Sequence, residues 1–328
     1  MDTVLVIGGT RFIGRHTVEV FRDQGYDVTI FNRGTHSNPF ADDPTIEHVA
    51  GNRRDREDLR AAREAVDPDA VVDCVAYFPE DVREATDVFS DAGAYVYVSS
   101  GAAYGAERVP KRENDTVLAD CTPEQATTDS AATYGPRKAE GDREVFAAAD
   151  RGVRAMSVRP TVVYGPHDYT ERFDYWIDRV DHHDAVVVPS DGLSLWQMAY
   201  VEDVASALRI VAENGEAGAA YNVGDEHAPT LGGWIELLAD ACDTSVEAVG
   251  ASERELARFD LEPDSFPIYR SPPHLLSVEK LRSLGWSSTS HDEALAATVT
   301  EHRASERTGR EAGPDRAYEQ RMIRELGE

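Results

Sequence analysis

The chain has 328 residues, and its 61 Asp and Glu residues against 33 Lys and Arg residues give a formal net charge of −28. This balance argues against nucleic-acid binding, which needs a basic face, and no apolar run reaches the length of a membrane span. The acidic residues are spread along the whole chain, which is typical of cytoplasmic proteins from salt-loving organisms. Such a surface stays soluble when salt screens its charges, whereas self-repulsion destabilises it in dilute buffer.

The cysteines and histidines carry no metal-binding pattern. Cys74, Cys121 and Cys242 are scattered without a Cys-x-x-Cys pair, and the sequence has no His-Glu-x-x-His motif. The neighbouring His182 and His183 lack further ligands nearby, so we expect them at the surface and expect no metal. Because the chain begins directly with a strand pattern, we expect no signal peptide and a protein of the reducing cytoplasm.

The N-terminal stretch Val4–Gly14 is the most informative part of the sequence. Four apolar residues predict a buried parallel strand, Gly8 and Gly9 follow as a turn, and a helical pattern begins at Phe12. A strand, a glycine turn and a helix form the first unit of a dinucleotide-binding fold, in which the helix N-terminus faces the phosphates. Arg11 replaces the usual middle glycine. The residues expected around the cofactor here are Gly8, Gly9, Thr10, Arg11, Phe12, Ile13 and Gly14.

Apolar runs alternate with helical patterns through the first half of the chain. We expect strands near residues 3–7, 27–31, 45–49, 70–75, 94–99 and 153–159, and helices near residues 12–24, 55–65, 80–92 and 134–150. This alternation predicts an α/β fold of the Rossmann type, a doubly wound parallel sheet with a smaller C-terminal substrate lobe.

The end of the second predicted strand bears on the choice of cofactor. Asn32 stands where an acidic residue would bind the adenosine ribose of NAD, and Arg33 follows it. Arg can hold a 2′-phosphate with charge-assisted hydrogen bonds, which slightly favours NADP. The alternative is that Arg33 stacks on adenine or points to solvent while NAD is bound. We also expect the small Ala76 close to the cofactor.

A second candidate site involves hydroxyl side chains and a lysine. The run Tyr95-Val-Tyr-Val-Ser-Ser100 predicts a strand that ends in Ser99 and Ser100. Tyr134 and Lys138 are four residues apart, which places both on one face of a helix, and Pro136 suits the first turn of that helix. A surface tyrosine and a solvated lysine are the alternative interpretation, but the order of the glycine turn, the serines and this pair favours a functional site.

After Pro166 the pattern becomes irregular. Strands are expected near 186–188 and 219–223, and helices near 201–213, 230–242 and 290–303. We predict a Rossmann domain over 1–165, with segments near 185–225 returning to it, an interleaved substrate lobe over 166–304, and a polar tail over 305–328. The loop-rich segment 255–275 suits either a lid or a surface excursion. In the tail, Tyr318, Met322 and Leu326 share one helix face.

These motifs in this order resemble the extended short-chain dehydrogenase/reductase family, the NAD-dependent epimerase/dehydratase group. The resemblance covers roughly residues 3–300. The variant Gly-Gly-Thr-Arg-Phe-Ile-Gly is similar to an atypical branch that includes chloroplast stem-loop RNA-binding proteins. The segments that carry the resemblance are the glycine turn, Ser99-Ser-Gly-Ala-Ala-Tyr-Gly105, Tyr134-x-x-x-Lys138, Arg159-Pro-Thr-Val-Val-Tyr-Gly-Pro166, Tyr200-Val-Glu-Asp203, Tyr221-Asn-Val-Gly224 and Leu284-Gly-Trp286.

The resemblance implies hydride-transfer chemistry at a carbinol or ketone carbon. A free tyrosine has a pKa near ~10, and a lysine one helical turn away favours its phenolate. Tyr134 is then the general base in oxidation and the general acid in reduction, Lys138 also holds the nicotinamide ribose, and Ser100 holds the substrate oxygen. The resemblance also places Asn52 near the adenine, at a position where relatives often carry an Asp. Candidate substrate contacts are Ser99, His167, Asp168 and Arg172, although a loop salt bridge would also explain Asp168 and Arg172.

Several reactions stay open. Dehydrating relatives carry acidic residues just after this serine, and Gly101 and Ala102 stand there instead, which leaves a sugar or nucleotide-sugar epimerase or an NADPH-dependent reductase. A non-catalytic dinucleotide-binding or RNA-associated protein is a further alternative, but the first kind usually lacks the tyrosine–lysine pair and the second needs a basic groove. The expected partner is a small molecule, and neither nucleic acid nor a membrane is expected. A homodimer would use the helices at 80–92 and 134–150.

Overall fold

The computed structural model describes residues 1–326, and the chain divides into two compact units. The first unit is made of Met1–Thr161, Val201–Gly224 and Leu276–Ser287. The second unit is made of Val162–Tyr200, Asp225–Leu275 and the residues from Ser288 onward. Each unit is therefore built from three separate stretches of the sequence.

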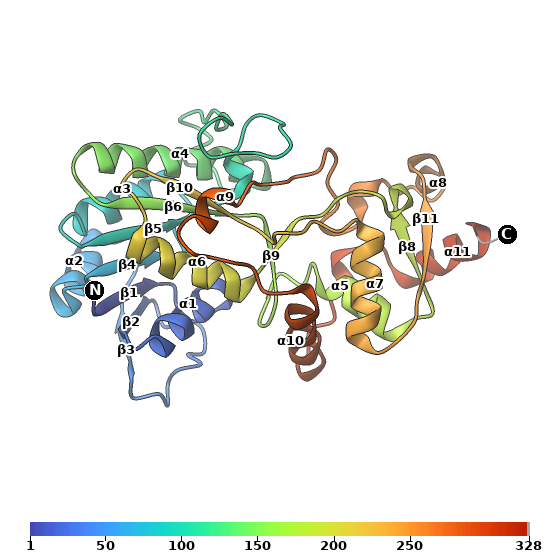
Figure 1. Ribbon diagram of the computed structural model, residues 1–328, viewed down its shortest axis with the longest axis horizontal. Coiled ribbons are helices and arrows are strands. Elements are labelled where there is room, and N and C mark those ends of the chain that lie inside the picture. Colours follow the sequence, from blue (N-terminus) through green and yellow to red (C-terminus); the bar gives the residue numbers. More distant parts are fainter. Residues whose placement is uncertain (327–328) are drawn as a thin grey trace. The chain divides into compact units, whose positions relative to one another are not determined.

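A seven-stranded parallel sheet forms the centre of the first unit (Figure 1). The second and third strands of the chain lie on one side of the first strand, and the later strands lie on its other side. The strand order therefore reverses between β1 (Thr3–Ile7) and β4 (Ala70–Asp73). In such sheets, ligands bind outside the carboxyl ends of the strands at this reversal. The strands, in their spatial order, are β10 (Ala220–Val223), β6 (Ala155–Pro160), β5 (Ala94–Val98), β4 (Ala70–Asp73), β1 (Thr3–Ile7), β2 (Asp27–Asn32) and β3 (Ile46–Ala50). The predicted doubly wound parallel sheet is confirmed.

Helices cover both faces of this sheet. One face packs on α2 (Arg56–Val66), α3 (Pro79–Val88) and α4 (Ala131–Asp150), and their shared core includes Leu5, Val71 and Tyr95 from the strands. The other face packs on α1 (Phe12–Asp23) and α6 (Val201–Asn214), which contact each other. The short α9 (Glu279–Arg282) lies against β10. The inner strands β1, β4, β5 and β6 are buried because both faces are covered, which explains their nearly continuous apolar sequences, whereas the edge strand β3 is mostly exposed.

The second unit is smaller and has two pairs of parallel strands. β7 (Val162–Tyr164) pairs with β9 (Met198–Tyr200), and β8 (Ala185–Pro189) pairs with β11 (Glu247–Ala251). Its helices include two predicted ones, at 230–242 and 290–303, and one that the sequence pattern did not indicate, at 174–182. The helices are α5 (Asp174–His182), α7 (Leu231–Cys242), α8 (Glu253–Ala257), α10 (His291–Ala304) and α11 (Arg316–Leu326).

The C-terminal helix α11 packs on β8 within the second unit. Met322 is fully buried, and the buried carboxylate of Glu319 accepts a hydrogen bond from the Val187 N–H at 2.9 Å. Tyr318 is 47 % exposed, with the Arg321 guanidinium 4.4 Å from its ring centroid. The buried face of this helix therefore centres on Glu319 and Met322 and excludes Tyr318. Among residues 1–326, no helix combines the length and the apolar character needed to cross a membrane.

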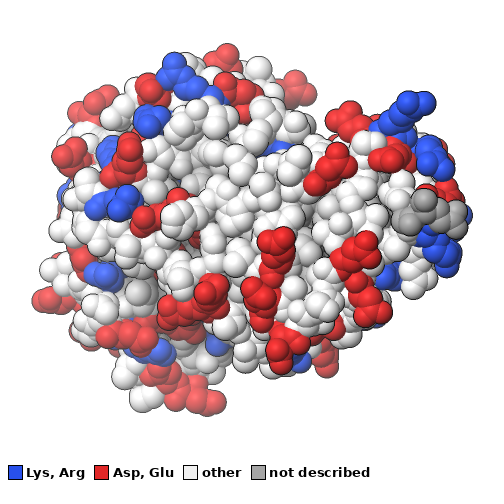
Figure 2. Space-filling view, turned by 45° about the vertical axis from the view of Figure 1, so that its right-hand side comes forward, with Lys and Arg blue, Asp and Glu red and all other residues white. Residues whose placement is uncertain are grey.

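Acidic side chains are distributed over the face shown in Figure 2, and basic side chains are fewer there. Many of the carboxylates have no cation beside them, so the net charge of −28 acts as repulsion across the surface. Salt shortens the range of that repulsion, because the Debye length falls from about 10 Å at 0.1 M to about 3 Å at 1 M.

We therefore expect KCl to stabilise the fold. Raising KCl from about 0.1 M to about 1 M should raise the midpoint of thermal unfolding by roughly 5–10 °C. The unfolding midpoint is measured by following the helical circular dichroism signal as the temperature rises. An uncharged osmolyte at equal osmolality is the control, since it screens no charge, and an equal rise with that osmolyte would contradict the electrostatic explanation.

Candidate active site

The glycine turn after β1 lies at the carboxyl edge where the strand order reverses. Gly8 has φ +94°, and a Cβ there would be 2.5 Å from a methyl group of Val75. A Cβ at Gly14 would be 2.3 Å from the Gly8 carbonyl oxygen, so helix α1 begins directly against the turn. A Cβ at Gly9 would meet Val18, which assigns this glycine to the packing of α1 on the sheet. The first turn of α1 carries no acidic side chain.

Asn32 ties the end of β2 to the glycine turn. Its Nδ2 donates to Thr10 Oγ1 at 3.4 Å, and its Oδ1 accepts from the Gly34 N–H at 2.7 Å and lies 3.0 Å from His48 Nε2. Arg33 is exposed and makes no hydrogen bond or ion pair with any residue in 1–326. Its guanidinium is therefore available to a ligand at this corner of the sheet.

The loop after β3 contains a buried cation that sequence reasoning missed. Asn52 is exposed, and its Oδ1 accepts from the Arg54 N–H at 3.2 Å. Arg53 is buried between Asp73, with which it forms a hydrogen bond, and Asp81, whose Oδ1 lies 3.2 Å from Nη1. Burial alone would lower the pKa of Arg53, but the charges of these two carboxylates raise it above its ordinary value. The sequence could have indicated this cation through Asp73, the acidic residue at the end of the apolar strand β4, because a buried carboxylate requires a cation.

Helix α4 begins one turn earlier than predicted. Its first residue is Ala131, because the Ser130 hydroxyl accepts from the Thr133 N–H and the Thr133 hydroxyl interacts with the Ser130 N–H in return. Pro136 therefore lies inside the helix and not in its first turn. Tyr134 and Lys138 still share a helix face, Tyr134 half-buried and Lys138 buried.

The Lys138 ammonium group connects three elements. Its Nζ donates to the carbonyl oxygen of Ala76 at 2.9 Å and to that of Val98 at 2.8 Å, and it lies 5.9 Å from the Tyr134 ring centroid. Burial lowers the pKa of Lys138 to about 8, against the opposing charges of nearby carboxylates. Ala76 presents its carbonyl to this group, while its methyl is fully buried in the hydrophobic core and does not line an open groove.

The serines meet α4 through a close backbone contact. Ser100 begins the 3-10 helix η1 (Gly101–Ala103), and its Oγ accepts from the Ala102 N–H at 3.1 Å, which leaves its proton to donate. A Cβ at Gly135 would be 2.5 Å from the Ala102 carbonyl oxygen. The absence of a side chain at Gly135 thus brings the helix with Tyr134 against the turn with Ser100. Ser99 is buried, and its hydroxyl has no hydrogen-bond partner in the described part of the chain.

Arg137, another residue that the sequence analysis did not single out, fixes the loop after β4. Its guanidinium donates to the Tyr77 carbonyl oxygen at 3.0 Å and to Asp129 Oδ1 at 2.7 Å, and lies 4.6 Å from the Phe78 ring centroid. Arg137 and Lys138 therefore hold successive carbonyl groups of one loop.

Three of the recognised motifs are joined by a buried chain of hydrogen bonds. Arg159 Nε donates to Asp142 Oδ2 at 2.8 Å, and Arg159 Nη1 donates to Tyr104 Oη at 2.9 Å. Tyr104 Oη in turn donates to Asn222 Oδ1 at 2.8 Å. The polar residues of these motifs thus tie β6, β10 and the turn after β5 together.

The predicted substrate contacts His167, Asp168 and Arg172 belong to the second unit. His167 Nδ1 lies 3.1 Å from Glu301 Oε1, and the His167 N–H donates to Glu301 Oε2 at 3.0 Å. The Asp168 carboxylate is buried and accepts from the Thr170 N–H at 2.9 Å, while the exposed Arg172 donates to the Thr170 hydroxyl at 3.1 Å. A role for these three residues in substrate binding stays a prediction.

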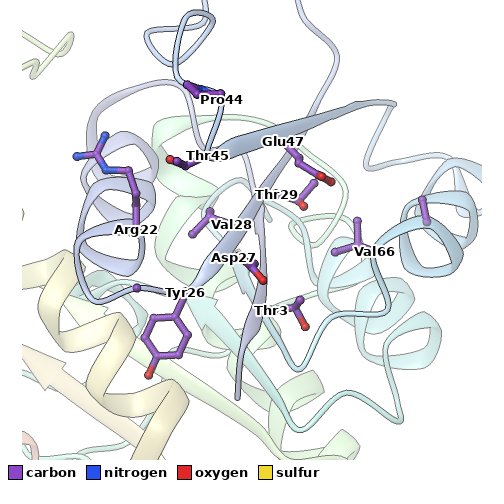
Figure 3. A pocket seen from close by; sticks show the side chains of 12 residues that line it. Thr3, Arg22, Tyr26, Asp27, Val28, Thr29, Pro44, Thr45, Glu47 and Val66 are labelled. Atoms are coloured by element: carbon purple, nitrogen blue, oxygen red, sulfur yellow. The ribbon is translucent and has the colours of Figure 1, made fainter.

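A groove of about 580 Å³ lies elsewhere on the first unit, near the amino ends of β1 and β2 (Figure 3). Charged and hydroxyl side chains dominate its lining, which includes Arg22, Tyr26, Asp27 and Glu47. None of the predicted site residues lines it, so this groove is separate from the candidate active site.

The contact between Gly135 and Ala102 generates a stability prediction. Gly135→Ala should destabilise the protein by about 1–3 kcal/mol, because the added methyl group forces α4 away from η1. Gly232→Ala is the matched control: its Cβ would find no atom closer than 3.5 Å, and it should be neutral or stabilise by up to about 1 kcal/mol. Urea denaturation in high salt measures both, and equal effects would contradict the packing argument.

Comparison with known proteins supports the same fold and family. The model of the NAD dependent epimerase/dehydratase family matches residues 4–224. The chain is 27% identical over 302 residues to the chloroplast stem-loop binding protein of 41 kDa b of Arabidopsis thaliana, covering 86% of this chain and 74% of the relative. It is 26% identical to the low-salt glycan biosynthesis protein Agl12 of Haloferax volcanii, covering 90% and 97%.

Among solved structures, the dTDP-glucose 4,6-dehydratase of Bacillus anthracis in complex with NAD has the same fold, with a TM-score of 0.71. The identity is 20%, over 93% of this chain and 98% of that one. The family match spans the glycine turn, the tyrosine–lysine helix and the last strand of the large sheet. The chain belongs to the NAD dependent epimerase/dehydratase family.

Proposed function

We propose that this protein is an NAD(P)-dependent epimerase-type oxidoreductase that acts on a carbinol carbon of a sugar or nucleotide sugar. The observation that carries the proposal is the contact of Gly135 with Ala102, because it brings the Tyr134–Lys138 helix against the Ser100 turn. The carboxyl edge of the sheet beside the strand-order reversal is where this fold binds its ligands. The nucleotide sugars named for relatives, such as dTDP-glucose, support the substrate class.

The residues at this edge fit a dinucleotide. The first turn of α1 offers N–H groups and no carboxylate to a pyrophosphate, and Arg33 offers an unpaired guanidinium. The buried Ser99 hydroxyl has no hydrogen-bond partner among residues 1–326 and is available to a ligand atom. When bound, the nicotinamide supplies the hydride chemistry.

The protein's own groups handle the proton and the substrate oxygen. In oxidation, Tyr134 Oη takes the proton of the substrate hydroxyl, and in reduction it returns a proton to the ketone oxygen. The positive charge of Lys138 favours the phenolate form of Tyr134 in between. The Ser100 hydroxyl, whose oxygen already accepts from the Ala102 N–H, donates to the substrate oxygen.

An NADPH-dependent reductase is the second candidate, and the free Arg33 guanidinium is the observation that favours it. A 2′-phosphate would pair with Arg33, and an enzyme that uses NADPH as a reductant exchanges its cofactor after each turnover. RNA association, which the name of the plant relative suggests for that protein, finds less support. In the basic run Arg53-Arg54-Asp-Arg56, which the acidic Asp55 already dilutes, Arg53 is buried and Arg56 pairs with Glu84.

A homodimer through α3 and α4 remains part of the proposal. These helices pack side by side on one face of the sheet. The cytoplasm remains the proposed location, and the second unit the proposed substrate lobe.

We expect Tyr134→Phe to abolish turnover, because no other group in its place can exchange the proton. Proton NMR of mixtures with UDP-glucose or dTDP-glucose, in high salt and with NAD or NADPH added, measures product formation. The affinity of the Tyr134→Phe protein for the cofactor, measured by fluorescence, should be nearly unchanged. Tyr318→Phe is the control, since this exposed tyrosine of α11 belongs to none of the predicted sites and its loss should leave turnover unaltered. Undiminished turnover by the Tyr134→Phe protein would refute the mechanism.

Arg33→Ala should weaken the binding of NADPH by about tenfold or more and leave NADH nearly unaffected, because only NADPH carries the 2′-phosphate. Isothermal titration with both nucleotides measures the two dissociation constants. Arg22→Ala, at the groove away from the site, is the control. Equal weakening of both nucleotides by Arg33→Ala would remove the argument for NADP. Mass spectrometry of the nucleotide released on denaturation separates a retained cofactor, expected of an epimerase, from an exchanging one.

A further inference from the structure

The charge of Lys138 has no carboxylate beside it. No ion pair joins Lys138 to any residue in the described range 1–326. The carboxylates whose charges act on it are already held by arginines: Asp73 and Asp81 by Arg53, and Asp142 by Arg159. The ammonium group therefore depends on neutral partners for its stability in a buried place.

These neutral partners are two carbonyl groups and the faces of three tyrosine rings. Lys138 Nζ lies 4.8 Å from the ring centroid of Tyr97, 5.4 Å from that of Tyr77 and 5.9 Å from that of Tyr134. Tyr97 is the closest and is fully buried, whereas Tyr77 is 40% exposed. A cation–ring contact is strongest where water is excluded, so Tyr97 contributes most.

The position of the Tyr97 ring is fixed from both ends. Its backbone belongs to β5, in register with Asp73 of β4 and Ser157 of β6. At the far end, a Cβ at Gly141 would be 2.6 Å from Tyr97 Oη, so the hydroxyl fills the space that this glycine of α4 leaves. The ring therefore cannot withdraw from Lys138 without displacing α4.

We propose that Tyr97 is a positioning residue for Lys138: its ring face takes the place of a carboxylate, keeps the ammonium group charged and holds it beside the ring of Tyr134. The consequence for catalysis rests on the proposed function. If Tyr134 and Lys138 act as a pair, Tyr97 sets the upper limit of the pH range in which the lysine retains its charge.

The groups that face Lys138 determine how large the effect is. They are Asp73 of β4, Cys74 and Tyr77 of the following loop, Asp81 of α3, Tyr97 of β5, and Tyr134, Arg137 and Asp142 of α4. Burial lowers the pKa of Lys138 to about 8 even with these carboxylates near. Removing the attraction of one desolvated ring should increase its acid constant by about tenfold.

The chain's three lysines make the test direct. Protein labelled with 13C at the lysine ε-carbons gives three signals, and Lys111→Arg and Lys280→Arg assign the other two. The Lys138 signal is titrated with pH in wild type, in Tyr97→Phe, and with a trifluorinated phenylalanine at position 97, which keeps the ring's shape and removes the negative charge of its face. Because the shape is kept, the fluorinated variant folds whenever Tyr97→Phe does.

We expect Tyr97→Phe to leave the pKa of Lys138 nearly unchanged and the trifluorinated ring to lower it by about one unit. The same fluorinated ring at Phe89, which is fully buried in the same hydrophobic core, is the control, and fluorination there should change nothing. An unchanged or higher pKa with the fluorinated ring at position 97, or an equal fall with it at position 89, would overturn the proposal.

The titration needs no substrate, so it fails or succeeds independently of the proposed function. Where a substrate is turned over, the basic limb of the kcat/KM profile should shift to lower pH with the fluorinated ring and return with Phe. If the pKa of Lys138 falls but the kcat/KM profile of the fluorinated variant matches that of the wild type, Tyr97 does not set the pH range of catalysis. Absence of any turnover, with the expected titration, would count against the proposed function and would leave the contact between ring and lysine established.

Discussion

The two hydrogen bonds that Lys138 Nζ donates to Ala76 and Val98 are the interaction on which the candidate site depends. They join α4 to the loop after β4, the strand beside the point where the sheet order reverses, and to the carboxyl end of the neighbouring β5. Because a helix is rigid, fixing Lys138 also fixes Tyr134 one turn earlier. The capped start of α4 and the bare backbone at Gly135 make that placement compatible with the Ser100 turn. One buried amine thus sets the register of three elements.

Buried charges around this amine are balanced by arginine. Arg53 forms ion pairs with Asp73 and Asp81, and Arg159 forms one with Asp142. Removing one partner from a buried pair costs about 3–5 kcal/mol, because the remaining charge stays uncompensated. The guanidinium keeps its charge at any pH at which the protein folds, so the surroundings of Lys138 stay constant while Lys138 itself can titrate. This separates the groups that hold the site from those that can react.

The sequence predicted the parallel sheet well, since strands such as β1 and β5 are buried on both faces and their apolar runs are unmistakable. It also predicted that Tyr134 and Lys138 share a helix face. It failed at the start of α4, because Pro136 was taken as a first-turn residue and the cap at Ser130 was overlooked. It missed α5 for a different reason: Asp174 and Asp178 are buried among the apolar residues of that helix and interrupt its apolar pattern.

The physical account of α5 lies in residues far along the chain. Asp174 Oδ1 lies 2.8 Å from His302 Nδ1 and its Oδ2 accepts from Arg307 at 3.0 Å, while Asp178 accepts from Arg310. Pairing of this kind cannot be deduced from local sequence, because the partners are separated by more than 100 residues. The contacts of Arg53 with Asp73 and Asp81 span only 20 and 28 residues, but they join the loop after β3 to β4 and α3, so they also depend on the tertiary fold.

The scarcity of lysine has a practical consequence for handling the protein. Lys111 is fully buried, Lys138 is 3% exposed, and Lys280 is half-buried over the ring of Tyr221. Amine-directed dyes, cross-linkers or solid supports therefore meet almost no accessible lysine amines. Carboxylate-directed coupling, by contrast, would give a heterogeneous population, because acidic side chains are numerous and spread along the chain.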